Sequence, residues 1–176
     1  MEKIEFEIES ICPLMMDNFT QEKQPTTEKE YLKQAPLKAY RDEKGNLAIP
    51  AMALKAALRD QAVDIGPKMQ SKKTREKIRA CLFIEPDMLS IGKKDFDCID
   101  KRMVTRKGSG QKVTRVPSFR PLIKEWKTSG TIYIMDSLTP DFIKEALETS
   151  GFMKGVLSYR PEFGRFKVTK FKVVKN

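Results

Sequence analysis

Two cations on one predicted helix are the first residues of this chain that suit binding of a charged partner. The stretch from Gly45 to Arg59 reads as a turn, a short apolar strand, and a helix opened by Pro50. Proline is tolerated at the first helical position because the N–H of that residue has no partner within the helix. The helix begins with its free N–H groups and its positive end, where a phosphate can be held, and Lys55 and Arg59, four residues apart, share one face beside an apolar stripe. This arrangement predicts a phosphate-binding helix; the alternative is an ordinary amphipathic helix with two solvated cations.

A second cationic feature is a predicted β-hairpin over residues 99–119. Apolar and β-branched arms flank a glycine-containing loop at residues 107–110, a pattern typical of such a turn. Residues 101–124 carry eight lysines and arginines and no carboxylate to neutralise them. Apolar side chains in the arms can wedge against bases while the cations hold phosphates, which predicts nucleic-acid binding. The alternative is a solvent-exposed hairpin whose lysines prevent edge pairing. The cations in the hairpin or at its edge are Lys101, Arg102, Arg106, Lys107, Lys112, Arg115 and Arg120.

A third feature is the segment from Gly155 to Phe166, in which aromatic residues alternate with cations. Glycine lets a backbone approach a phosphate closely, and tyrosine offers a surface on which a base can stack. We therefore add Tyr159, Arg160 and Arg165 to the candidate nucleic-acid contacts. The segment reads equally well as a turn before a core strand.

The charge distribution favours a polyanionic partner. The net charge is +10, and the cations concentrate in residues 67–80, 101–124 and 151–176. Residues 1–30 carry eight acidic residues against three lysines. Cations concentrated in segments expected to be ordered are the electrostatic footprint of a phosphate backbone. We expect single-stranded RNA or DNA as the partner, with a merely solvated cationic surface as the alternative.

Composition excludes several other classes of protein. The chain has no histidine, so the histidine general base of processing ribonucleases and the serine–histidine and cysteine–histidine hydrolases are excluded, while serine–lysine chemistry stays formally open. Cys12, Cys81 and Cys98 are widely spaced, so we expect no disulfide and no zinc site. No P-loop or dinucleotide fingerprint is present, so we expect no cofactor. No stretch approaches the roughly 18 apolar residues of a membrane span, and glutamates interrupt the start of the chain. We expect a cytoplasmic protein that does not contact a membrane.

The N-terminal elements follow from hydrophobic periodicity. Ile4, Phe6 and Ile8 alternate with glutamates, which predicts a half-buried strand with an acidic outer face. Residues 17–44 are polar and read as an irregular surface excursion. The helix after Pro50 has an apolar stripe that we expect to face the core, formed by Ala51, Leu54, Leu58 and Ala62.

The C-terminal half predicts a helix and a final strand. Thr139 and the proline after it form a helix start, and Gly151 is expected to end that helix as its C′ glycine. The last strand, residues 165–174, changes its apolar phase, which predicts a bulge near Thr169. Pro121 is expected to break the chain after the hairpin. The order of elements predicts one α+β domain over residues 1–176, with an antiparallel sheet and helices packed on one face.

The motif around Pro50 resembles a known signature. The run Ile49-Pro50, Leu54-Lys55 and Leu58-Arg59 is similar to the I-P-G-S-S-L-K-G-x-L-R motif of the RAMP superfamily, and more specifically of the backbone subunits of CRISPR effector complexes. Gly155–Phe166 resembles the C-terminal glycine-rich loop of that superfamily, and the resemblance covers most of the chain. The departures suggest a diverged member, stand-alone or encoded by a mobile element. Those in the motif are Ala51, Met52 and Ala53 in place of Gly-Ser-Ser, and Ala56 in place of the second glycine.

The resemblance implies a modified RRM-like (ferredoxin-like) sheet with a protruding basic hairpin as a thumb. It implies antiviral defence and non-catalytic binding of single-stranded nucleic acid, RNA favoured, along a basic groove. Lys55 and Arg59 would contact the backbone, and the hairpin would reach between bases. The expected assembly is a homo-oligomer or a complex with other RAMP-like subunits.

Two other functions stay open. Some backbone subunits cut target RNA with one aspartate in the loop after the first strand, which makes Asp17, and secondarily Asp42, a weak catalytic candidate for a metal-dependent endoribonuclease. A lone loop aspartate is more often a turn residue. The third hypothesis is a protein-interaction subunit or inhibitor that docks on a CRISPR-like complex through the acidic N-terminal face.

Overall fold

The order of strands and helices in this chain is that of a split β-α-β-β-α-β fold. The computed structural model describes residues 1–65, 71–107, 113–135 and 137–174. The central antiparallel sheet has the strand order β4-β8-β1-β9, and helices connect its strands in the ferredoxin-like manner. The α+β prediction is therefore confirmed. The elements of this unit are β1 (Glu2–Ser10), α2 (Ala51–Ile65), β4 (Leu82–Glu85), β8 (Lys127–Ile134), α4 (Pro140–Met153) and β9 (Phe166–Val174).

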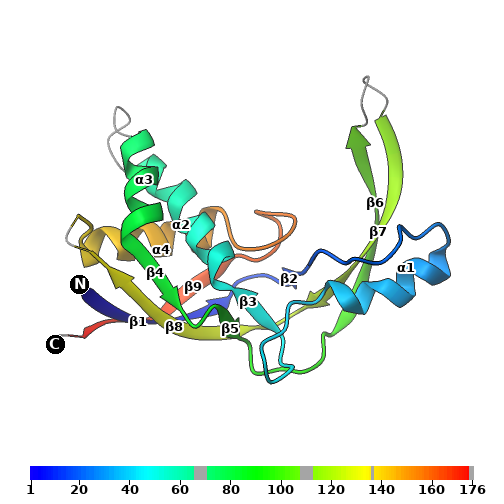
Figure 1. Ribbon diagram of the computed structural model, residues 1–176, viewed down its shortest axis with the longest axis horizontal. Coiled ribbons are helices and arrows are strands. Elements are labelled where there is room, and N and C mark those ends of the chain that lie inside the picture. Colours follow the sequence, from blue (N-terminus) through cyan, green and yellow to red (C-terminus); the bar gives the residue numbers. More distant parts are fainter. Residues whose placement is uncertain (66–70, 108–112, 136, 175–176) are drawn as a thin grey trace.

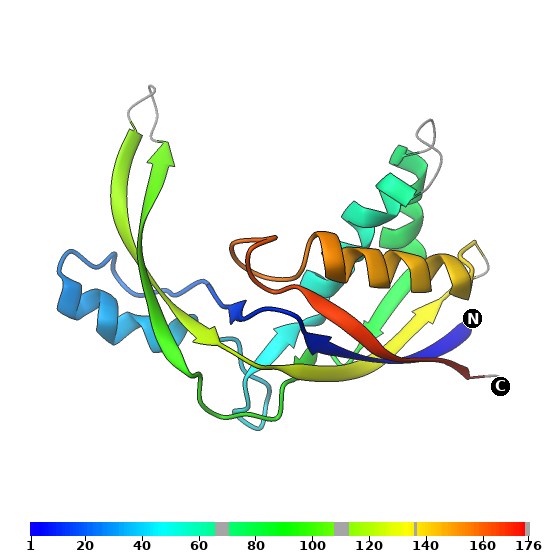
Figure 2. The same ribbon diagram turned by 180° about the vertical axis from the view of Figure 1, so that it is seen from behind.

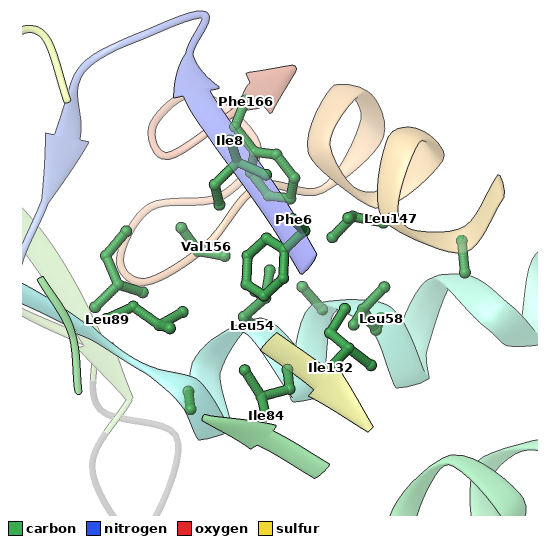
Figure 3. Close-up of a cluster of buried hydrophobic side chains, with 14 of the residues drawn as sticks. Phe6, Ile8, Leu54, Leu58, Ile84, Leu89, Ile132, Leu147, Val156 and Phe166 are labelled. Atoms are coloured by element: carbon green, nitrogen blue, oxygen red, sulfur yellow. The ribbon is translucent and has the colours of Figure 1, made fainter. Parts of the chain in front are cut away.

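The core lies between this sheet and the helices on one of its faces. Figure 3 shows Phe6 at the centre of a cluster that joins Leu54 and Leu58 of α2 to Leu147 of α4 and Phe166 of β9. The predicted apolar stripe of α2 is buried throughout. Helix α3 (Ser71–Cys81) packs on α2, and its Ile78 is buried in the same core. Among the residues with described positions, no helix is long and apolar enough to cross a membrane.

The outer face of the sheet carries both acidic and basic side chains. Glu5 of β1 accepts a hydrogen bond from Lys170 of β9 at 3.0 Å, and Lys127 of β8 lies 2.9 Å from Glu7. The hydrogen bond from Lys170 lowers the pKa of Glu5, and that from Lys127 lowers the pKa of Glu7. Because neighbouring strands supply these lysines, the glutamates do not form an uncompensated acidic face.

The predicted irregularity in the last strand is confirmed. The pairing of β1 with β9 shifts register between Glu7, which faces Lys170, and Ile8, which faces Val168. Thr169 is thus the extra residue of a β-bulge, and its hydroxyl donates a 2.9 Å hydrogen bond to the Glu7 carboxylate. The bulge returns alternate apolar residues of β9 to the core side.

The start of α2 lies one residue later than expected. Pro50 is the last residue of β3 (Ala48–Pro50), which pairs with β5 (Met88–Ser90). The helix begins at Ala51, whose N–H donates to the carbonyl of Asp87 at 2.7 Å. The first backbone donor of the helix is therefore already used within the protein.

The predicted end of α4 was wrong. The helix continues through Gly151 to Met153, because Gly151 allows close packing on β9: a Cβ there would lie 2.3 Å from the carbonyl oxygen of Phe166. The residue in the left-handed conformation that follows the helix is Gly155, with φ +72°. Its N–H donates to the Ser150 carbonyl at 2.8 Å, a typical C-terminal cap.

The predicted hairpin is present and longer than expected. It consists of β6 (Cys98–Lys107) and β7 (Val113–Ile123), and the short strand β2 (Leu14–Met15) pairs with the end of β7. Pro121 does not end β7, because its carbonyl accepts a 3.0 Å hydrogen bond from the Met16 N–H and pairing continues on that side.

The segment 17–44 is more regular than expected. It contains the helix α1 (Glu28–Gln34) and a 3-10 turn, η1 (Ala35–Lys38). Thr27 and Glu30 form a capping box, in which the Thr27 hydroxyl accepts from the Glu30 N–H and the Glu30 carboxylate accepts from the Thr27 N–H. The sequence signal for this helix, Thr-x-x-Glu, was present and missed.

The hairpin and the α2–α3 pair project from opposite ends of the sheet toward the same side of the molecule (Figure 1). The loop after α4 lies between them, as the view from behind also shows (Figure 2). The concave side of the protein is thus bordered by three segments that the sequence marks as cationic.

Candidate nucleic-acid interface

Strand pairing gives the hairpin two different faces. Lys101 is directly opposite Phe119, and Asp100 is directly opposite Arg120. Side chains of paired residues lie on the same face, and successive residues alternate between faces. Lys101 and Phe119 therefore share one face, and Arg102 shares the other with Arg120.

Helix α1 covers the base of the first face. The ring of Tyr31 stacks on that of Phe119, with centroids 5.3 Å apart. The ammonium of Lys101 lies 5.4 Å from the centroid of Phe119 and 3.0 Å from the carboxylate of Glu28. Because α1 has no buried residue of its own, these contacts are a large part of what holds it on the hairpin.

The loop after α4 contacts the base of the second face. The guanidinium carbon of Arg102 lies 4.6 Å from the centroid of Tyr159 and 5.0 Å from that of Phe163. The guanidinium carbon of Arg120 lies 4.7 Å from the centroid of Tyr159. Arg102 also makes a two-pronged ion pair with Asp100, and the hydrogen bonds from this pair raise its pKa. Tyr159 thus joins the loop to both arms of the hairpin.

The loop is held in one shape by close backbone packing. Leu157 and Tyr159 adopt left-handed conformations, with φ 63° and 56°, which are uncommon for residues other than glycine. Gly164 has φ +77°, and a Cβ there would lie 2.0 Å from the Val156 carbonyl oxygen. Gly155 and Gly164 therefore allow one end of the loop to pack on the other.

Asp17, the catalytic candidate, lies beside the hairpin between two cations. Its carboxylate is 2.7 Å from Arg120 and 3.3 Å from Lys38. Asp42 instead organises a turn, where its carboxylate accepts hydrogen bonds from the N–H groups of Lys44 and Asn46. No group of three potential metal ligands occurs among the residues that the structure describes.

The two cations of α2 are already engaged by neighbouring groups. The ammonium of Lys55 donates a 2.9 Å hydrogen bond to the Arg79 carbonyl and lies 5.2 Å from the centroid of Phe83. Burial lowers the pKa of Lys55. Arg59 pairs with its neighbour Asp60 at 2.9 Å. Lys55 therefore ties α2 to the last turn of α3.

The expectation that no carboxylate neutralises the hairpin was wrong for three of its cations. Distant or adjacent acids pair with them: Glu28 with Lys101, Asp100 with Arg102, and Asp17 with Arg120. Arg115 and Arg160 are exposed, and Arg165 is half-buried with a buried Nε that has no hydrogen-bond partner among the described residues. Lys112 and the side chains of Arg106 and Lys107 lie outside the described part of the chain.

Helix α3 carries cations that the candidate site did not include. Its exposed bases lie on the arm of the molecule opposite the hairpin (Figure 1). The signal was available as the cationic block at residues 67–80, but only the three-dimensional arrangement relates that block to the hairpin. These exposed bases are Lys72, Lys73, Arg75, Lys77 and Arg79.

The split β-α-β-β-α-β sheet with helices on one face defines a protein with a ferredoxin-like fold. No protein-family model and no curated protein matches the chain. Among solved structures, a chain in the cryo-EM structure of the Type III-B Cmr-beta bound to cognate target RNA is similar, with a TM-score of 0.58 at 13% identity. The match covers 99% of this chain and 61% of that chain. The likeness shows a shared fold.

Proposed function

We propose that this protein binds single-stranded nucleic acid, RNA in preference to DNA, as a non-catalytic subunit of a CRISPR-like complex. The observation that carries the proposal is the placement of the cationic hairpin, the Tyr159 loop and α3 on one concave side of the molecule. A flexible, unpaired strand can follow such a surface, and cations along it hold the phosphates. The similar chain described above comes from a complex bound to target RNA, which supports the same partner.

The two faces of the sheet differ in what they offer to a polyanion. On the outer face, Glu5, Glu7 and Glu9 pair with lysines, so the charges compensate locally. In the segments that border the concave side, Arg160 of the loop after α4 and the α3 bases Lys72 and Lys73 are exposed. We therefore assign binding to the concave side, with Lys55 and Arg59 as further contacts at its α2 border. The same local compensation weakens the case for a docking partner on the N-terminal face.

Binding without cleavage is the function that the surroundings of Asp17 favour. Mg²⁺ is held by oxygen ligands and keeps much of its water, whereas the Asp17 carboxylate faces the cationic groups of Lys38 and Arg120. A metal ion at Asp17 would have to displace both cations against like-charge repulsion. Uncleaved labelled RNA after incubation with Mg²⁺ is the expected result, and fragments that disappear with Asp17→Asn would show a nuclease instead.

Fluorescence anisotropy with labelled single-stranded RNA and DNA tests the proposal. Binding should weaken steeply between about 50 and 200 mM salt, because each phosphate contact releases counterions. The variant Arg160→Glu, in the loop that borders the concave side, should bind several-fold more weakly than the wild type. The matched control Lys172→Glu makes the same charge change at an exposed position of β9 and should bind more tightly than Arg160→Glu. Absence of binding to either polymer at low salt would refute the proposal.

A further inference from the structure

A cleft lies between the segment after β2 and the hairpin, and Arg120, which contacts Tyr159, is one of its lining residues. Its volume is about 410 Å³, within the range of about 300–1,000 Å³ typical of sites for small organic ligands. One wall comes from residues 17–38 and the other from β7. The lining residues that matter for binding are Asn18, Phe19, Gln24, Tyr31, Lys38 and Arg120.

One end of the cleft is built to hold an anion. Lys38 and Arg120 converge on the Asp17 carboxylate at 3.3 Å and 2.7 Å. The Nε of Arg120 is buried and has no hydrogen-bond partner among the described residues. Guanidinium and ammonium groups that grip a carboxylate in this way have the geometry and charge to hold a phosphate.

The rest of the cleft offers aromatic surface and amide groups. Phe19 is 85% exposed, a large apolar ring left in water. Tyr31 lies on Phe119 and also lines the cleft. Asn18 and Gln24 each carry both hydrogen-bond donors and an acceptor. Aromatic rings stack on the face of a nucleobase, and amide groups pair with its edge.

We propose that this cleft is a subsite for one nucleotide of the bound single strand. The phosphate replaces Asp17 on Lys38 and Arg120, the base stacks against Phe19, and its edge faces Asn18 and Gln24. The inference rests on the proposed function and extends the interface from the Tyr159 loop to the segment after β2, with Arg120 shared by both. Asp17 then serves as a stand-in for phosphate, keeping two like charges together while no strand is bound.

Replacement of the exposed ring tests the subsite by anisotropy with single-stranded RNA. Stacking on an aromatic side chain contributes about 1–3 kcal/mol per base, so Phe19→Ala should weaken binding by about five-fold or more. Leu37 is a matched control, since it is 51% exposed on η1 and does not line this cleft. Leu37→Ala should bind as the wild type does, and both variants should keep the wild-type melting temperature.

Photo-crosslinking gives a second measurement that does not depend on a variant. RNA that carries 4-thiouridine should crosslink to the peptide containing Phe19 or to that containing Tyr31. Crosslinks confined to other peptides, or equal affinity of Phe19→Ala and Leu37→Ala, would overturn the subsite and leave the proposed function intact. Wild-type protein that binds no RNA or DNA would overturn both.

Free mononucleotides distinguish a strand from a small-molecule ligand with the same chemistry. Uridine and adenosine monophosphates are titrated alone and as competitors of RNA. Weak binding of either monophosphate, with competition only at high concentration, is expected for a subsite that holds one unit of a longer strand. Tight binding of a monophosphate that RNA does not displace would overturn the assignment to a strand.

Discussion

Tyr159 should contribute measurably to the attachment of the hairpin. Its ring lies 4.6 Å and 4.7 Å from the guanidinium carbons of Arg102 and Arg120, whose side chains are 33% and 17% exposed. A cation–π contact contributes about 0.5–1 kcal/mol when exposed and about 2 kcal/mol when desolvated. For two half-buried contacts we expect Tyr159→Leu, which keeps apolar bulk but removes the π face, to lower the free energy of unfolding by about 2 kcal/mol.

A double-mutant cycle isolates this contribution from other effects of the substitution. Urea unfolding is measured for Tyr159→Leu, Arg120→Met and the double variant, and the coupling should be about 1 kcal/mol. Arg115→Met supplies the control cycle, because Arg115 is exposed farther along β7. A coupling between Tyr159 and Arg120 no larger than that of the control cycle would refute the cation–π attachment.

Three further predictions concern the loop, the sheet and α2. Gly164→Ala should lower the unfolding free energy by about 3 kcal/mol or more, because its Cβ would meet backbone. The control Gly92→Ala, at the same φ of +77° but in open space, should lower it by about 1 kcal/mol. Equal losses in the two variants would contradict the packing argument. The hydrogen bond from Lys170 lowers the pKa of Glu5 below its usual 4.5, so the stability it adds is present above that pH and is lost as pH falls through the lower folded value. Glu5→Gln should therefore flatten the acid side of a denaturation profile as pH falls below 4.5, and an unchanged profile would rule the pair out. Lys55→Met should lower stability by about 1.5–3 kcal/mol through loss of a charged donor on a backbone carbonyl; full stability combined with weaker RNA binding would instead show that Lys55 contacts phosphate.

Local patterns in the sequence predicted those elements whose causes are local. The alternation of Ile4, Phe6 and Ile8 gave β1, and the phase change near Thr169 gave the bulge, because side-chain direction alternates along a strand. The errors at Gly151 and Pro121 have tertiary causes. Gly151 serves a close approach to β9, and the Pro121 carbonyl is paired with a segment distant in the chain, so neither residue acts as the breaker its type suggests.

The candidate site was predicted by residue type and only in part by arrangement. The sequence brought Arg102, Arg120 and Tyr159 into one set of candidates, and the structure places them in contact. The sequence could not show that Glu28 and Asp17 pair with hairpin cations, since partners far apart in sequence meet only through the fold. The count of cations in a segment therefore overstates the charge that the folded surface presents.

The short junction between β7 and β8 sets the angle between the hairpin and the central sheet. Only residues 124–126 separate the two strands, and the indole of Trp126 is buried there, with its N–H donated to the Cys12 carbonyl at 3.1 Å. At about 3.4 Å per residue the hairpin is about 30 Å long, so a tilt of roughly 10° at its base moves its far end by about 5 Å. Trp126→Phe removes the hydrogen bond that fixes this junction and would therefore change where along a bound strand the hairpin cations lie. The number of these cations, and with it the salt dependence of binding, would stay the same.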